Sequence, residues 1–122
     1  MKILYISGPF SPLPGDADPL HSTEHNILQA SRYALLAARK GWAPFCPHKN
    51  TSGFHHVPDL SEEFWLECCL EYVRRCDAVL MIPGWERSEG AKREYYLAHA
   101  LGKPIFRVTV DGMVPEPGMV RE

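Results

Sequence analysis

The sequence has no apolar run long enough to cross a membrane, and its amino end enters a strand-like segment rather than a signal peptide. It also has no excess of positive charge, because 13 lysines and arginines face 15 aspartates and glutamates, for a formal net charge of −2. That balance gives no sign of the basic surface on which proteins bind polymeric nucleic acid. We therefore expect a cytoplasmic protein that meets neither membranes nor nucleic acid polymers and whose partner is a small molecule.

Cysteine pairs with zinc-site spacing are absent as well. The four cysteines are Cys46, Cys68, Cys69 and Cys76. The adjacent pair would make a poor disulfide framework, so we expect reduced thiols that mainly pack. Of the six histidines, His48, His55 and His56 come nearest to a cluster, yet no helical histidine pair and no acid at ligand spacing accompanies them. The sequence thus predicts no metal site and no cofactor.

The remaining composition is typical of one globular domain. The chain has 122 residues, 45% of them hydrophobic, which suffices for a single core spanning residues 1–122. Residues 111–122 are rich in proline and glycine and predict an irregular tail. Short apolar runs predict strands over Lys2–Ser7, Trp42–Cys46, Ala78–Ile82 and Ile105–Val110.

Three helices are expected between these strands. They run from Ser22 or Thr23 to Lys40, from Asp59 to Arg75, and from Ser88 to Leu101. The alternation of strands and helices, with right-handed crossovers, predicts a mainly parallel sheet of four to five strands with helices on both faces. The expected fold class is therefore α/β, a three-layer sandwich.

The sequence predicts a capping box at the start of the second helix, formed by Asp59 and Glu62.

Periodicity assigns a buried side to each helix. The expected buried stripe of the first helix is Ile27, Ala30, Ala34, Leu35 and Ala38. Bulky residues predict that the second helix is either deeply buried or pressed against another subunit; they are Phe64, Trp65, Leu66, Cys69, Leu70, Tyr72 and Val73.

The third helix carries an acid among small apolar residues. Ala91, Glu94, Ala98 and Leu101 share one face by their spacing. Burial raises the pKa of a carboxyl group and so prepares it for chemistry. Spacing alone nevertheless favours a structural interpretation, in which Glu94 pairs with an arginine or reaches solvent at the helix edge.

The carboxyl ends of three strands are expected to meet at one rim of the sheet. Glycine and proline at these ends permit close backbone approach, and an aromatic ring or a histidine suits a flat ligand. The helix that starts at Ser88 points free amides at the same rim, which attracts a phosphate or another anion. Each end taken alone is explained equally by an ordinary turn. The three ends read Ser7-Gly8-Pro9-Phe10, Cys46-Pro47-His48 and Pro83-Gly84-Trp85.

Four ordered blocks carry a resemblance that covers nearly the whole chain. They are KILYISGPF at the start, RCDAVLMIPGW, the S-x-G-x-x-x-E pattern from Ser88 through Gly90 to Glu94, and the closing ALGKPI. Together they resemble the nucleoside 2-deoxyribosyltransferase-like superfamily, in its small members of the DUF4406 and DUF1937 type. The resemblance implies a flavodoxin-like or Rossmann-like fold, chemistry at the N-glycosidic bond of deoxynucleosides or their monophosphates, and a homodimer or larger homo-oligomer.

The same resemblance implies roles for individual residues. Glu94 matches the nucleophile that attacks the anomeric carbon, giving a glycosyl-enzyme that water or a second base resolves. Tyr5 would steady the Glu94 carboxylate or the sugar. The expected substrate-binding residues are Ser7, Gly8, Pro9, Phe10, His48, Gly84, Trp85, Ser88 and Gly90.

Two positions bear on the substrate and on turnover. Ser88 stands where the transferases carry an acid that meets the free 5′-hydroxyl of the sugar, which favours a 5′-monophosphate and hydrolysis. Cys69 stands where the family usually has an aspartate that acts on the leaving base, and a thiol of ordinary pKa replaces that acid poorly. Glu62 or His48 could substitute for the missing aspartate.

Three other functions stay open. Loss of base protonation would leave a catalytically reduced, nucleotide-binding regulatory module of the same fold. An unrelated Rossmann-like domain would hold Glu94 for structure alone. A phosphoribohydrolase of the lysine-decarboxylase-like type does comparable chemistry with a P-G-G-x-G-T-x-x-E loop, but the loop here is longer and lacks a second glycine after Gly84.

Overall fold

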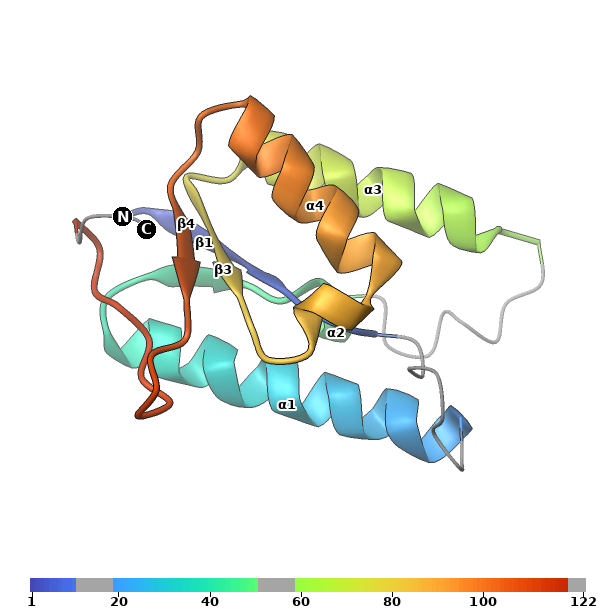
Figure 1. The fold of residues 1–122 in the computed structure, drawn as a ribbon, viewed down its shortest axis with the longest axis horizontal. Coiled ribbons are helices and arrows are strands. Elements are labelled where there is room, and N and C mark those ends of the chain that lie inside the picture. Colours follow the sequence, from blue (N-terminus) through green and yellow to red (C-terminus); the bar gives the residue numbers. More distant parts are fainter. Residues whose placement is uncertain (11–18, 51–58, 119–122) are drawn as a thin grey trace.

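A computed structural model describes residues 1–10, 19–50 and 59–118 of the chain. Strands and helices alternate along it, as the sequence predicts (Figure 1). The strands are β1 (Ile3–Ser7), β2 (Ala43–Phe45), β3 (Ala78–Met81) and β4 (Ile105–Arg107). The helices are α1 (Pro19–Arg39), α2 (Pro47–Asn50), α3 (Glu62–Arg75) and α4 (Glu89–Ala100), with a 3₁₀ turn, η2 (Trp85–Arg87), before the last.

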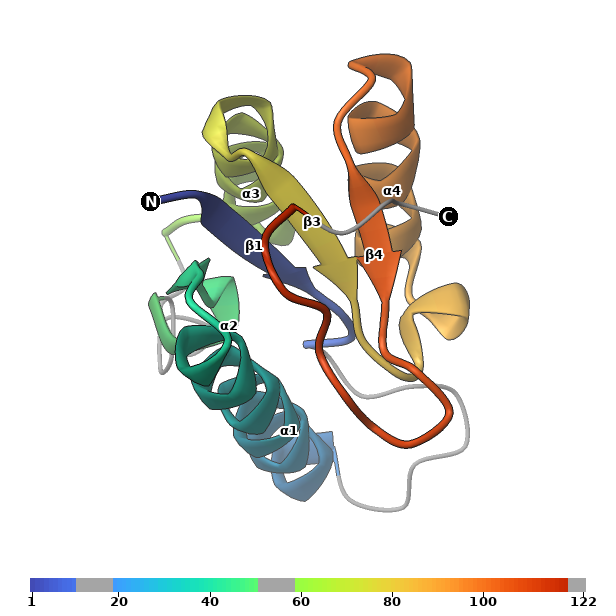
Figure 2. The same cartoon turned by 90° about the vertical axis from the view of Figure 1, so that its left-hand side faces the viewer.

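All four strands are parallel, in the order β2-β1-β3-β4. Ser7 of β1 lies opposite Met81 of β3, which lies opposite Arg107 of β4. Helix α1 covers one face of the sheet, and α3 and α4 cover the other (Figure 2). The α/β three-layer prediction is confirmed. The strand order reverses between β1 and β3, which is the switch point where open parallel sheets bind ligands.

Successive strand residues face opposite layers and therefore build two cores. The core under α1 contains Leu4, Ile6, Ala30, Ala37, Trp42, Leu80, Ile82 and Phe106. The core under α3 and α4 contains Tyr5, Val73, Val79, Met81, Ala91 and Ala98. Strands β1 and β3 contribute to both cores, which explains why their sequences are almost continuously apolar.

Two predicted helix starts were wrong. Helix α1 begins at Pro19 rather than after Ser22 or Thr23, because proline needs no amide partner in the first turn of a helix. Helix α3 is capped by Ser61, whose Oγ accepts the backbone N–H of Phe64 at 3.1 Å, rather than by Asp59. The Asp59 and Glu62 capping box is therefore absent.

The buried stripe of α1 is rotated from the predicted one. Ala30 and Ala37 are fully buried, whereas Leu35 is 54% exposed and Ala38 is exposed. Leu101 follows the end of α4 and is 49% exposed, so its predicted burial was also wrong. A stripe defined by spacing alone can rotate by one residue, because the docking angle of a helix is set by its neighbours.

The bulky helix α3 is buried on one side only. Leu70 and Val73 enter the core, but Phe64 near its amino end is 46% exposed.

The predicted strands were also too long at their ends, and β4 stops at Arg107 instead of Val110.

Beyond β4 the described residues have no further helix or strand, as expected for the tail. Two contacts nevertheless tie this segment to the α1 layer. Val114 is buried in that core, and Trp42 donates its indole N–H to the carbonyl oxygen of Pro115 at 2.7 Å. Of the three histidines that come nearest to a cluster in the sequence, His48 lies in α2, whereas His55 and His56 lie outside the described residues.

Two residues within the sequence blocks have structural partners. Asp77 accepts the backbone N–H of Ile3 through Oδ2 at 2.7 Å, which ties the start of β3 to the start of β1. Lys103 donates from Nζ to the carbonyl oxygen of Cys76 at 2.6 Å, at the carboxyl end of α3. These contacts give Asp77 in RCDAVL and Lys103 in ALGKPI a role in the fold itself.

Candidate functional site

The Glu94 side chain lies on the inward face of α4 and is 7% exposed. Tyr5 donates its hydroxyl hydrogen to Oε2 of Glu94 at 3.0 Å, and Ser7 donates its hydroxyl hydrogen to Oε1 at 2.6 Å. The predicted burial of Glu94 is confirmed. The partners expected in the structural interpretation were wrong, because the carboxyl group contacts two hydroxyls rather than an arginine or solvent.

Burial dominates the electrostatics of this group. Burial raises the pKa of Glu94 to about 7. The two hydrogen bonds favour the ionised form and lower the pKa, but their effect is smaller than that of burial. Burial and the adjacent Glu94 charge raise the pKa of Tyr5 well above its usual value, so Tyr5 remains a neutral donor. The site therefore holds a carboxyl group that is divided between its two protonation states at neutral pH.

Strand geometry explains why both donors reach the same acid. Tyr5 and Ser7 are two residues apart on β1, so their side chains point to the same layer. Ser88 begins α4 by accepting the backbone N–H of Ala91 through Oγ at 3.2 Å, which confirms the predicted N-cap. Glu94 lies less than two turns further along, opposite the carboxyl end of β1 at the switch point of the sheet.

Gly8 follows Ser7 directly and is packed tightly against Ile82, the residue after β3. A Cβ atom at this position would lie 2.3 Å from Cγ1 of the fully buried Ile82. Real Cβ atoms essentially never approach another atom so closely, so the fold itself requires that position 8 has no side chain.

We expect Gly8→Ala to destabilise the fold by about 1–3 kcal/mol, the usual cost of overpacking a core. In an Ile82→Ala background the same substitution should cost much less, since Cγ1 is gone. Gly90→Ala is the matched control, because its Cβ would meet only Leu66 at 3.7 Å and the Ser88 hydroxyl at 4.0 Å. Denaturant unfolding measures all three, and an equal cost for Gly8→Ala in both backgrounds would contradict the steric explanation.

His48, Pro9 and Phe10 lie together beside the end of β1. His48 is buried in α2 and donates from Nε2 to the carbonyl oxygen of Pro9 at 2.9 Å. Its ring lies 5.8 Å from that of Phe10, centroid to centroid. Burial lowers the pKa of His48, so the ring is neutral at physiological pH. The structure thus brings the predicted residues of two strand ends into contact.

Trp85 has its ring contacts on the β4 side of the site. Its ring stacks on Tyr95 at 4.9 Å between centroids, and the Arg107 guanidinium lies 5.2 Å from its centroid. Gly84 precedes it with a φ of 95°, a conformation that favours glycine. Gly84 therefore has a backbone reason for its identity, and Trp85 packs against Tyr95, the neighbour of Glu94 in α4.

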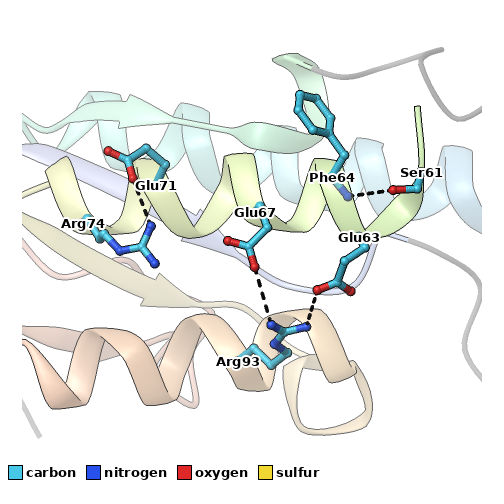
Figure 3. Close-up of polar contacts among 7 residues, drawn as sticks. All are labelled: Ser61, Glu63, Phe64, Glu67, Glu71, Arg74 and Arg93. Carbon is cyan, nitrogen blue, oxygen red and sulfur yellow. Dashed lines mark hydrogen bonds and ion pairs between the residues drawn. The ribbon is translucent and has the colours of Figure 1, made fainter. Parts of the chain in front are cut away.

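The charged residues beside Glu94 form ion pairs at the surface. Arg93 bridges α4 to α3 through Glu63 at 3.4 Å and Glu67 at 3.9 Å (Figure 3). Lys92 pairs with Glu89 within α4 at 2.9 Å. Exposed pairs of this kind contribute little to stability, but the bridge links the two helices that cover the site.

The sequence predicted that Tyr5 and Glu94 lie together, but it did not predict that Ser7 bonds Glu94 or that Cys69 packs near Tyr5. Ser7 is fully buried with its hydroxyl on Glu94, which the i, i+2 spacing from Tyr5 could have indicated. Cys69 in α3 packs against the buried cluster that contains Tyr5. Glu62, considered as a substitute acid, is exposed at the first residue of α3.

Residues 1–10, 19–50 and 59–118 contain neither a candidate metal site nor a helix that could span a membrane. In these ranges no three or more histidine, cysteine, aspartate or glutamate side chains are grouped so that they could hold a metal ion. Within the same ranges, no helix combines the length and the apolar character that crossing a bilayer requires.

Comparison with known proteins supplies the family. A sequence family described as a domain of unknown function, DUF4406, matches residues 2–107, which include the whole group formed by Tyr5, Ser7 and Glu94. The chain belongs to the DUF4406 family. No curated protein matches its sequence. The predicted membership of the DUF4406 type is thereby confirmed.

Solved structures share the fold of this DUF4406 protein. A 2-deoxyribosyltransferase from Leishmania mexicana matches it with a TM-score of 0.58 at 20% identity, over 100% of this chain and 79% of that one. A conserved protein from Enterococcus faecalis V583 gives 0.60 at 18% identity, over 91% and 65%. A CMP N-glycosidase from Clostridium botulinum gives 0.51 at 19% identity, over 87% and 67%.

These TM-scores establish a common fold, and the low sequence identities establish nothing beyond it. The DUF4406 chain spans less than two thirds of the Enterococcus protein and about two thirds to four fifths of the other two. A 2-deoxyribosyltransferase and a CMP N-glycosidase thus share the fold that the predicted resemblance implies.

Proposed function

We propose that this DUF4406 protein cleaves the N-glycosidic bond of 2′-deoxynucleoside 5′-monophosphates or nucleosides, with Glu94 as the nucleophile and water as the preferred acceptor. One observation carries the proposal: a buried carboxyl group, held by the hydroxyls of Tyr5 and Ser7, at the switch point of a parallel sheet. A buried carboxyl group that can ionise lowers the stability of the fold, so its presence here supports a functional role. Its use in an N-glycosidase is supported by the shared fold of the deoxyribosyltransferase and the CMP N-glycosidase.

The ionised form of Glu94 performs the first step. One carboxylate oxygen bonds to the anomeric carbon as the bond from that carbon to the base nitrogen breaks, and the electron pair leaves with the base. Tyr5 and Ser7 hold the carboxylate in one orientation during this attack. In the second step water attacks the same carbon, its proton is released, and the Glu94 carboxylate departs with the electrons of the ester bond.

A 5′-phosphate is the favoured substrate group because Ser88 places a neutral side chain at the amino end of α4. Ser88 uses its hydroxyl to cap the helix and adds no negative charge where an anion would approach. The structural likeness to a protein that acts on CMP is consistent with this preference. Phe10 and His48, which lie together beside Pro9, form the proposed wall for the base.

One observation favours a second candidate function, a nucleotide-binding module without efficient turnover. Burial raises the pKa of the Cys69 thiol to about 11, so it is a weak acid for protonating a departing base. Glu62 is exposed and His48 is neutral, with its Nε2 hydrogen committed to Pro9. Tight nucleotide binding without release of base would identify this alternative.

Base release tests the proposal directly. The protein, its Glu94→Gln variant and a matched Glu89→Gln variant are incubated with deoxynucleosides and deoxynucleoside 5′-monophosphates, with and without an acceptor base, and products are separated by chromatography. Release by the wild type and Glu89→Gln but not by Glu94→Gln is expected. If no member of the panel loses its base while thermal shifts report nucleotide binding, the binding module replaces the enzyme.

We also propose a homodimer or larger homo-oligomer with α3 as a candidate contact. The amino end of α3 presents Phe64, which is exposed together with its neighbours Glu62 and Glu63. Light scattering that gives the mass of a single chain at micromolar concentration would contradict this assembly.

A further inference from the structure

Side chains from two helices hold the backbone that follows β1. The strand itself ends at Ser7. Beyond it, His48 of α2 donates from Nε2 to the carbonyl oxygen of Pro9 at 2.9 Å. Asn26 of α1 donates from Nδ2 to the carbonyl oxygen of Phe10 at 3.1 Å. Two successive carbonyl groups are therefore fixed by two different helices.

Asn26 is an amide on the apolar side of α1. It is 7% exposed, and by its spacing it shares this side with Ala30 and Ala37, which are fully buried in the core. Asparagine is a weaker helix former than alanine or leucine, and a buried amide costs free energy unless it is hydrogen-bonded. An amide at this position is therefore explained by its polar partner, the Phe10 carbonyl oxygen, rather than by packing.

The bond from Asn26 restrains the backbone from which the Phe10 ring extends. A held carbonyl group limits rotation about the ψ torsion of its own residue, which is one of only two soft torsions there. The Phe10 ring lies 5.8 Å from the His48 ring, and these two side chains form the proposed wall for the base. At the start of the same segment, Gly8 is confined by Ile82. Residues 8, 9 and 10 are thus each constrained by a different part of the fold.

We propose that Asn26 is a positioning residue for base binding: its amide holds the Phe10 carbonyl group, so that the Phe10 ring stands beside His48 before a nucleotide arrives. A side chain that is already in its bound position loses less conformational freedom on binding, which raises affinity. The inference rests on the proposed function, which assigns the base to the wall of Phe10 and His48. It adds to the site a residue of α1, the helix on the opposite face of the sheet from α4 (Figure 2).

The test compares ligands with and without a base. Deoxynucleoside 5′-monophosphates and 2′-deoxyribose 5-phosphate are titrated by calorimetry into the full chain carrying Glu94→Gln, so that the ligands are not consumed. Adding Asn26→Leu, which keeps the branching of the side chain without its donor, should raise the Kd of the nucleotide by about threefold to tenfold. The Kd of the sugar phosphate should not change. Gln29→Ala removes a less buried amide from the same helix and is the matched control.

A second variant separates loss of the hydrogen bond from a folding defect. Asn26→Ala removes the amide without adding atoms to the core, and it should weaken nucleotide binding as Asn26→Leu does. Circular dichroism at the titration temperature checks that each variant is folded. A folded Asn26→Ala protein that binds the nucleotide as tightly as its parent would overturn the proposal.

A double-mutant cycle with Phe10→Ala tests the route of the effect. If Asn26 acts through Phe10, Asn26→Leu changes the nucleotide Kd little once the ring is absent. An equal loss of affinity for nucleotide and sugar phosphate would instead assign Asn26 a general structural role and contradict the proposal. Nucleotide binding that depends on Asn26, in a wild-type protein that releases no base, would support the inference and refute the enzymatic activity.

Discussion

We expect Glu94→Gln to lose roughly 10³-fold or more of the base-releasing activity, because an amide cannot form the ester to the anomeric carbon. The variant keeps the size of the side chain and its capacity to bond the Tyr5 and Ser7 hydroxyls. Product chromatography under single-turnover conditions measures the loss. A thermal-shift titration should reveal continued nucleotide binding, since the substitution removes the nucleophile and leaves the rest of the site in place.

The pH dependence of the wild-type activity provides a second test of Glu94 as the nucleophile. Only the ionised Glu94 attacks, so kcat/KM should rise with pH and level off, with a midpoint near the pKa of about 7 in the free protein. Glu89→Gln, in the exposed first turn of the same helix, is the control and should retain the full profile. Activity of Glu94→Gln within tenfold of the wild type would remove Glu94 from the role of nucleophile.

The same substitution should stabilise the fold at alkaline pH. Burial raises the pKa of Glu94 from 4.5 to about 7, so between these values the folded protein binds a proton that the unfolded chain has released. The free energy of unfolding therefore falls as pH rises through this window and stays reduced above it. The shift corresponds to roughly 3 kcal/mol, at about 1.4 kcal/mol for each pKa unit.

Glutamine does not ionise and escapes this penalty. Denaturant unfolding of the wild type and Glu94→Gln should give similar stabilities near pH 4 and a difference approaching roughly 3 kcal/mol in favour of the variant near pH 8. His48 has a lowered pKa and costs stability as pH falls below 6.5, but it does so in both proteins and cancels in the difference. A difference that is constant from pH 4 to pH 8 would contradict the burial of an ionisable Glu94.

These two results together would explain why the fold holds an unfavourable acid. The position that lowers the stability of the folded chain is the one that keeps the carboxyl group unsolvated and oriented by two hydroxyls. The Glu94→Gln variant is therefore expected to lose activity and gain stability, as is common for substitutions at functional sites.

The sequence predictions were most accurate where they depended on interactions between residues close together in the chain. The Ser88 N-cap and the inward position of Glu94 depend on residues within one helix, and both were confirmed. The predicted start of α3 was wrong because Asp59 and Ser61 are both good caps, and the helix begins after Ser61. The stripe of α1 was wrong at Leu35 for a similar reason, since the sheet sets the rotation of the helix.

The sequence by itself determined the α/β class, the parallel sheet and the candidate nucleophile. Apolar runs, caps and the alternation of elements are local properties, and the four blocks added a family. Only the tertiary structure decided which groups surround Glu94. Tyr5 and Ser7 lie 89 and 87 residues before it, and Cys69 packs against the Tyr5 cluster from a third element. Contacts of this kind depend on register and helix docking, which no local pattern encodes.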